Sequence, residues 1–171
     1  MFKPFARILK HLWLDADDSS RAIPPDMLER LMRRVAASEK RHSGEIRICV
    51  EAGLPLSYLW RRASARERAV SLFGKLRIWD TADNNGVLIY LLLADHAIEI
   101  VADRGLNTHV TAVHWKALVA HMRGAFRKRR YEEGLTQVLE EISAVLMQHF
   151  ALPQSSTSTN PNELPDAPLL L

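Results

Sequence analysis

Two short polar segments of the chain carry carboxylate, amide and guanidinium groups. Their members are Asp80, Asp83, Asn84, Asn85, Asp103 and Arg104. The first segment precedes an almost unbroken apolar run at 88–93, and the second follows an alternating run at 98–101. A turn at Asp95 and His96 joins the two runs. If the runs pair as a hairpin, both polar segments emerge at the same end of the sheet, and loops held on a rigid scaffold often carry function.

These side chains have the chemistry of a divalent-cation site. Calcium and magnesium bind carboxylates, amide oxygens and backbone carbonyls. We therefore predict Asp80, Asp83 and Asp103 as metal ligands for calcium or magnesium. The remaining members of the set, Asn84, Asn85 and Arg104, are predicted to bind a ligand. The spacing does not match an EF-hand loop.

A purely structural interpretation of the same loops stays open. Asx side chains before a strand commonly bond nearby amides in turns, and Gly86 would then serve for its backbone freedom. Asp103 favours a site, because it adds a carboxylate from a second loop. Its alternatives are an ion pair with the residue that follows it or a helix-capping role.

The sequence favours a binding module over an enzyme. A phosphatase needs a nucleophile or metal-activated water, together with positive charge on the phosphoryl oxygens. Arg104 could supply the charge, but no GxxxxGK[ST] loop, GxSxG elbow or CxxxxxR loop occurs in the sequence. A weak metal-assisted acid phosphatase that uses the same loops is the alternative.

Composition limits the partners. The 171 residues are 47% hydrophobic with a net charge of +3, which suits one domain with a real core. The only basic run, Arg127–Arg130, lies where a helical pattern ends, so no nucleic-acid partner is expected. The single cysteine, Cys49, lies in a strand pattern and suits a buried structural thiol in a reducing compartment.

Residues 1–14 place apolar side chains at helical spacing. The apolar positions are Phe2, Phe5, Ile8, Leu9, Leu12 and Trp13. Such a helix packs onto its own domain, which is the default, onto an unknown protein partner, or onto a membrane surface. The sequence shows no run long enough to span a bilayer and no secretion signal. We therefore expect a cytoplasmic protein, peripheral at the inner membrane if the helix binds lipid.

The sequence divides into one domain of helices and strands and two flanking segments. Residues 1–23 are the amphipathic segment and a polar connector, 24–150 form the domain, and 151–171 are rich in Ser, Thr, Asn and Pro and are expected to be disordered. A helix begins at Pro24-Pro25-Asp26, and residues 45–52 alternate as a strand that is half covered or near a sheet edge.

The second half of the domain contains the remaining predicted helices and the hairpin. Ser64 and Glu67 form a capping box that starts a helix, and the hairpin follows. Two apolar stripes, at 110–126 and 135–150, predict the final helices. The run at 88–93 is apolar on both faces, so helices must cover both sides of it. We predict a three-layer α/β/α sandwich with a mixed sheet that contains a β-hairpin, plus the N-terminal amphipathic helix.

Several of these features resemble one known family. They are Asn84-Asn85-Gly86 before the apolar strand, the Asp95 turn, Gly105-Leu106, the helix residues Ala69 to Phe73, and the spaced Phe126, Tyr131 and Gly134. Together they resemble the TPM domain, named for a thylakoid-lumen phosphatase, a photosystem II repair protein and a nematode receptor modulator. The resemblance covers Pro24 to Phe150.

The resemblance implies an α/β sandwich whose loops hold a divalent cation in some relatives. It also implies acid-phosphatase activity, which is ascribed to plant members. The family commonly has glycine where this chain has Asp103. Many relatives carry a signal peptide and a membrane tail, and neither is seen in this sequence.

Overall fold

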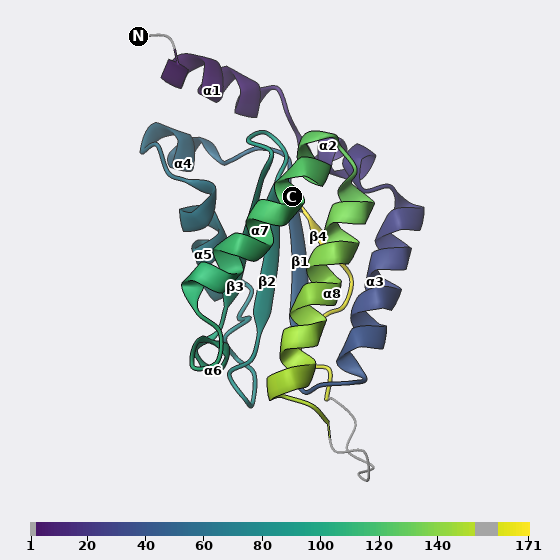
Figure 1. Ribbon diagram of the computed structural model, residues 1–171. Coiled ribbons are helices and arrows are strands. Elements are labelled where there is room, and N and C mark those ends of the chain that lie inside the picture. The colour runs from purple at the N-terminus through teal and green to yellow at the C-terminus, as the bar shows by residue number, and fades with distance from the viewer. Residues whose placement is uncertain (1–2, 153–160) are drawn as a thin grey trace.

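The computed structural model describes residues 3–152 and 161–171, and its centre is a mixed sheet (Figure 1). Its strands are β1 (Ile46–Glu51), β2 (Val87–Leu92), β3 (Ala97–Ala102) and β4 (Leu169–Leu170). Within the described residues the sheet has four strands in the order β3-β2-β1-β4. β1 runs parallel to β2 and β4, and β3 is antiparallel to β2.

The hairpin has the predicted form. Val87 pairs with Ala102 at one end, and Leu92 pairs with Ala97 beside the turn. All six residues of β2 are buried, whereas β3 is half-buried at Ala97, Glu99 and Ala102. The apolar run on both faces of β2 therefore marks a central strand, as its sequence predicted.

Eight helices surround the sheet in the described part of the chain (Figure 1). They are α1 (Lys3–Leu12), α2 (Ala16–Ala22), α3 (Pro25–Glu39), α4 (Leu56–Trp60), α5 (Ala65–Lys75), α6 (Arg104–Asn107), α7 (Ala112–Arg127) and α8 (Tyr131–His149). Residues of α3, α7 and α8 pack against Ile46, Ile48 and Val50 of β1. Residues of α4 and α5 pack against the opposite face, around Cys49. The three-layer α/β/α sandwich is confirmed.

Local sequence signals start several of these helices. Ser64 and Glu67 form the predicted capping box at α5, with Glu67 N donating to the Ser64 hydroxyl at 3.2 Å. Pro25 occupies the first turn of α3, where its missing N–H costs nothing. The predicted polar connector after residue 14 contains α2, because Asp15 and Asp18 form a second capping box. This helix was not predicted from the sequence, because its capping box is made of two aspartates in place of serine and glutamate.

The C-terminal segment corrects the predicted disordered tail. Residues 153–160 lie outside the described residues, but 161–171 pack on the domain, with Leu164 buried. β4 binds the outer edge of β1, where Leu171 N donates to Val50 O at 2.9 Å. A strand edge offers unpaired backbone groups, so even two apolar residues can add to it. The prediction of disorder over 151–171 is therefore wrong for 161–171.

The same addition changes the environment of β1. β1 was predicted to be half covered or near an edge, yet Arg47 is its one residue that is not fully buried. Glu51 is buried because Arg68 of α5 and the Tyr90 hydroxyl both donate to it, the latter at 2.6 Å. A charged side chain can be buried inside the sandwich when an opposite charge and hydrogen bonds compensate for the lost water.

Candidate functional site

The two predicted polar loops meet at the end of the sheet where β2 begins and β3 ends. Asp103 N donates to Gly86 O at 2.9 Å, and Gly105 N donates to Asn84 O at 2.9 Å. The Arg104 guanidinium Nε donates to Asn84 Oδ1 at 2.8 Å. The hairpin register therefore brings the loops together as the sequence predicted.

Two glycines allow close backbone contact at this end of the sheet. A Cβ on Gly105 would lie 2.6 Å from Asn84 O, and a Cβ on Gly86 would lie 2.0 Å from the carbonyl oxygen of Ile78. Gly86 does not have positive φ, whereas Asn84 does, at 52°. The predicted need for backbone freedom thus falls on Asn84, and Gly86 is required for space.

A serine from a third loop joins the site. The Ser43 hydroxyl donates to Asp83 Oδ2 at 2.7 Å and accepts from Asn85 Nδ2 at 3.1 Å. Ser43 lies just before β1, which runs parallel to β2, so the chain enters both strands from the same end. Sequence reasoning missed Ser43. Its position before Gly44 and an alternating strand was the available signal.

Two buried oxygen atoms at this end have no hydrogen-bond partner within the described residues. They are Asp103 Oδ2 and Asn85 Oδ1, on residues that are 9% and 0% exposed. The other carboxylate oxygen of Asp103 accepts from Arg104 N at 2.7 Å and caps α6. Buried polar atoms are normally satisfied, so each of these oxygens is a position that a cation or a hydrogen-bond donor could satisfy.

The three predicted metal-binding carboxylates have different partners. Asp80 forms an ion pair with Arg77, three residues earlier, and Asp83 accepts from Ser43. In residues 3–152 and 161–171 no three His, Cys, Asp or Glu side chains gather to hold a metal. Asp103 N donates to the carbonyl oxygen of Gly86, the residue after Asn85, so the backbone positions of Asp103 and Asn85 lie close together at this end of the sheet.

Comparison with known proteins identifies the family. The family model of the TPM domain matches residues 17–145. The chain belongs to the TPM domain family. Among solved structures, the NMR structure of the BA42 protein from the psychrophilic Bizionia argentinensis is 24% identical, with a TM-score of 0.71 over 86% of this chain and 94% of that one.

A second solved structure has the same fold. The N-terminal domain of a P. gingivalis protein is 18% identical, with a TM-score of 0.61 over 80% of this chain and 90% of that one. At these identities the two structures support the fold alone. The chain matched no curated protein.

Other reactive side chains of this TPM domain are structural. Cys49 is fully buried, and burial raises the pKa of its thiol to about 12, so the thiol is not a nucleophile at neutral pH. Burial lowers the pKa of His42 to about 4. The His42 ring contacts the Ser38 hydroxyl through Nε2 at 2.8 Å between α3 and α8. Trp79, which could have been a core residue, is instead 47% exposed, with the Arg77 guanidinium over its ring.

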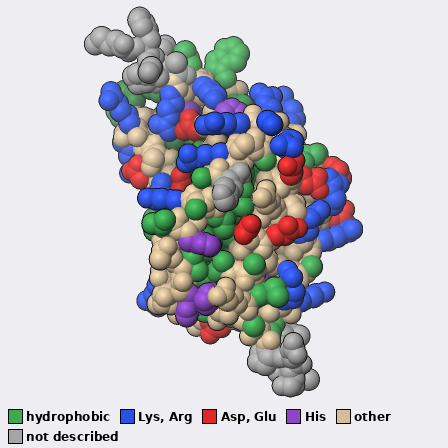
Figure 2. All heavy atoms as spheres, in the orientation of Figure 1, with side chains coloured by type: hydrophobic (Ala, Val, Ile, Leu, Met, Phe, Trp, Pro, Cys, Tyr) green, Lys and Arg blue, Asp and Glu red, His purple; other side chains and the backbone are tan. Residues whose placement is uncertain are grey.

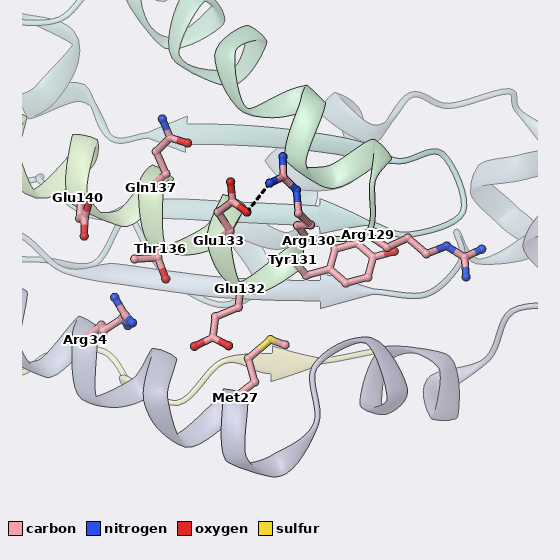
Figure 3. Close-up of a pocket in the computed structure, with 10 residues that line it drawn as sticks. All are labelled: Met27, Arg34, Arg129, Arg130, Tyr131, Glu132, Glu133, Thr136, Gln137 and Glu140. Atoms are coloured by element: carbon pink, nitrogen blue, oxygen red, sulfur yellow. Dashed lines mark ion pairs between the residues drawn. The ribbon is translucent and has the colours of Figure 1, made fainter.

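The groove between α3 and α8 is a separate feature. Its volume is about 610 Å³, and Figure 3 shows charged side chains from both helices along it. Opposite charges neutralise each other there: Arg130 pairs with Glu133 at 3.0 Å, and Glu132 pairs with Arg30 at 2.7 Å. None of the predicted site residues lines this groove.

The N-terminal helix packs onto its own domain, as expected by default. His11 of α1 is buried and contacts Asp95 of the hairpin turn through Nε2 at 3.0 Å. Arg7 donates to the other Asp95 carboxylate oxygen at 2.9 Å. Although burial opposes ionisation, these two partners hold the pKa of Asp95 well below its usual range. Within the described residues, none of the helices has the length and apolar character needed to cross a bilayer.

Proposed function

We propose that this TPM domain is an accessory binding module that takes a calcium or magnesium ion at the junction of its polar loops. The observation that carries the proposal is the pair of buried oxygens, Asp103 Oδ2 and Asn85 Oδ1, which lack hydrogen-bond partners in the described part of the chain. Leaving a buried acceptor unsatisfied costs about 1–3 kcal/mol, and more when it is charged. A hard cation would remove that cost at both atoms.

The donor set indicates weak binding. Asp103 and Asn85 supply one carboxylate and one amide, and Asp83 adds a second carboxylate through the loop that Ser43 holds. Asp80 is left out, because its carboxylate pairs with Arg77. Sites with few charged ligands have dissociation constants on the order of 10⁻⁴ to 10⁻³ M. A bound ion would neutralise Asp103 and fix the two loops together.

A weak metal-assisted acid phosphatase is the second candidate. The observation in its favour is the exposed Arg104, whose guanidinium lies beside the same loops and could bind a phosphoryl oxygen. The binding role is preferred, because the Arg104 guanidinium that would bind phosphate already donates to Asn84 Oδ1. Release of phosphate from p-nitrophenyl phosphate that needs both metal and Arg104 would reverse this preference.

Calorimetric titration with calcium tests the proposal. The wild-type protein should bind at millimolar metal, and Asp103→Asn, which keeps the shape and the helix cap, should bind at least about tenfold more weakly. Asp80→Asn is the matched control and should bind like the wild type. Equal affinity of wild type and Asp103→Asn, or absence of binding in the wild type, would refute the site.

A further inference from the structure

Large apolar side chains are exposed at the end of the sheet opposite the polar loops. The set is Leu9 at 44%, Leu12 at 54% and Trp13 at 84% exposed, with Leu56 at 61% and Trp60 at 88%. The first three lie on α1 or just after it, at i, i+3 and i+4, and the other two lie on α4. Exposure of such large apolar side chains to water is unfavourable, and a cluster of them is typical of a surface that binds a partner or a membrane.

The structure holds the two helices side by side. Leu54 N, just before α4, donates to His11 Nδ1 at 2.9 Å, and Arg7 donates to Ala63 O, just after α4, at 3.0 Å. Gly53 lets the chains approach, because a Cβ there would lie 2.6 Å from His11 O. Figure 1 shows α1 and α4 at the same end of the molecule. We call this surface, formed by residues 7–14 and 53–66, the α1–α4 face.

The charge of the α1–α4 face is one-sided. Neither of its two segments contains Asp or Glu, whereas Lys10, Arg61 and Arg62 are exposed. Arg7 is neutralised by Asp95, so it does not add to this charge. Figure 2 shows hydrophobic side chains flanked by Lys and Arg at this end. Basic side chains around exposed tryptophan and leucine match the interface of an anionic bilayer.

A cavity of about 650 Å³ lies next to this face. It is lined by Lys10 and Trp13 from the α1 side, by Arg129 from the turn between α7 and α8, by Tyr131 at the start of α8, and by His96 of the hairpin turn. Asp18 also lines it but pairs with Arg21 at 3.0 Å, so Lys10 and Arg129 leave the cavity positive. It lies at the carboxyl end of β2, where open α/β sheets usually bind ligands.

We propose that the α1–α4 face docks onto a bilayer that contains anionic phospholipid. Trp13, Trp60 and the neighbouring leucines enter the interfacial region, and the cavity beside Lys10 and Arg129 receives a lipid phosphate. This function is separate from the cation site, because the two surfaces lie at opposite ends of the sheet. A lipid surface fits better than a protein partner, since two tryptophans at the rim of a basic surface suit the headgroup region.

Vesicle co-sedimentation of the full chain tests the proposal. The protein should pellet with vesicles of phosphatidylcholine and phosphatidylglycerol and stay in solution with phosphatidylcholine alone. The double variant Trp13→Ala, Trp60→Ala should bind at least about tenfold more weakly. Lys10→Gln and Arg129→Gln should each weaken binding about fivefold. Circular dichroism and the melting temperature check that every variant folds.

Matched controls distinguish binding by this face from non-specific hydrophobic adsorption. Trp79→Ala and Val113→Ala remove apolar groups that are 47% and 75% exposed elsewhere, and both should bind like the wild type. Equal binding of the tryptophan double variant and the wild type would overturn the proposal, as would an absence of anionic-vesicle binding. Inorganic phosphate that binds the wild type but not Arg129→Gln, without vesicle binding, would assign the cavity to a free anion and also overturn it.

Discussion

Replacing Gly105 by alanine should separate the two polar loops. Gly105 does not have positive φ, so alanine can adopt its backbone conformation. The added Cβ, however, would lie 2.6 Å from Asn84 O and 2.7 Å from Asp83 O. Both are backbone atoms and cannot rotate away, so the loops must move apart.

The cost can be worked out from the contacts. Overpacking of this kind costs about 1–3 kcal/mol. Moving the loops also weakens the 2.9 Å bond from Gly105 N to Asn84 O. A lost hydrogen bond adds about 0.5–1.5 kcal/mol. Alanine recovers up to about 1 kcal/mol through its helix propensity in α6. We expect a net loss of about 2 kcal/mol, which lowers the melting temperature by about 4–8 °C in a domain of this size.

The assay is thermal unfolding followed by circular dichroism, with Gly74→Ala as the matched control. Gly74 lies in α5, and no atom lies within 4 Å of a Cβ built there. That variant should gain about 0.8–1 kcal/mol from helix propensity, so the two substitutions should have opposite signs. Stabilisation by Gly105→Ala would show that the loops do not approach closely and would refute the geometry of the site.

Three further predictions concern the interior. Arg68→Met should cost about 3–5 kcal/mol in denaturant unfolding, since it strands the buried Glu51 carboxylate. Adding Glu51→Gln should restore most of that stability, and a double variant no better than the single one would contradict this. Burial, with Glu45 and Asp166 nearby, raises the pKa of Glu39 to about 9. Stability from this raised pKa is therefore fully present below the unfolded-state pKa of about 4.5 and declines as pH rises toward 9. Glu39→Gln should flatten that decline in unfolding curves from pH 5 to 9, and an unchanged slope would contradict the assignment. Cys49 should resist a thiol reagent in the native state and react in denaturant, whereas rapid native labelling would contradict its burial.

The sequence predicts the sandwich well where the signal is local or continuous. The apolar run of β2, the capping box at Ser64 and the hairpin turn at Asp95 each depend on neighbouring residues, and the structure contains all three. β4 was missed because its partner, β1, lies more than a hundred residues earlier, and two leucines show no strand period. A pairing at such separation leaves no pattern in a single sequence.

The candidate site was predictable only in part, for the same reason. The hairpin register brings Asn84 and Arg104 together, so their contact follows from the sequence. The contribution of Ser43 depends on β1 lying beside β2, which is a matter of strand order. Asp80 was predicted as a metal ligand, yet its carboxylate forms an ion pair with Arg77, which lies three residues earlier. Local ion pairs compete with distant ligands for the same carboxylate.

A metal titration followed by amide chemical shifts tests the central claim most directly. Calcium or magnesium should shift the amides of residues 81–86 and 102–106 in a saturable way, with a midpoint on the order of a millimolar. The amides around His96, at the far end of the hairpin, should stay in place. Spectra that remain unchanged at several times that metal concentration, or shifts spread evenly over the acidic surface, would contradict a cation site where the polar loops meet.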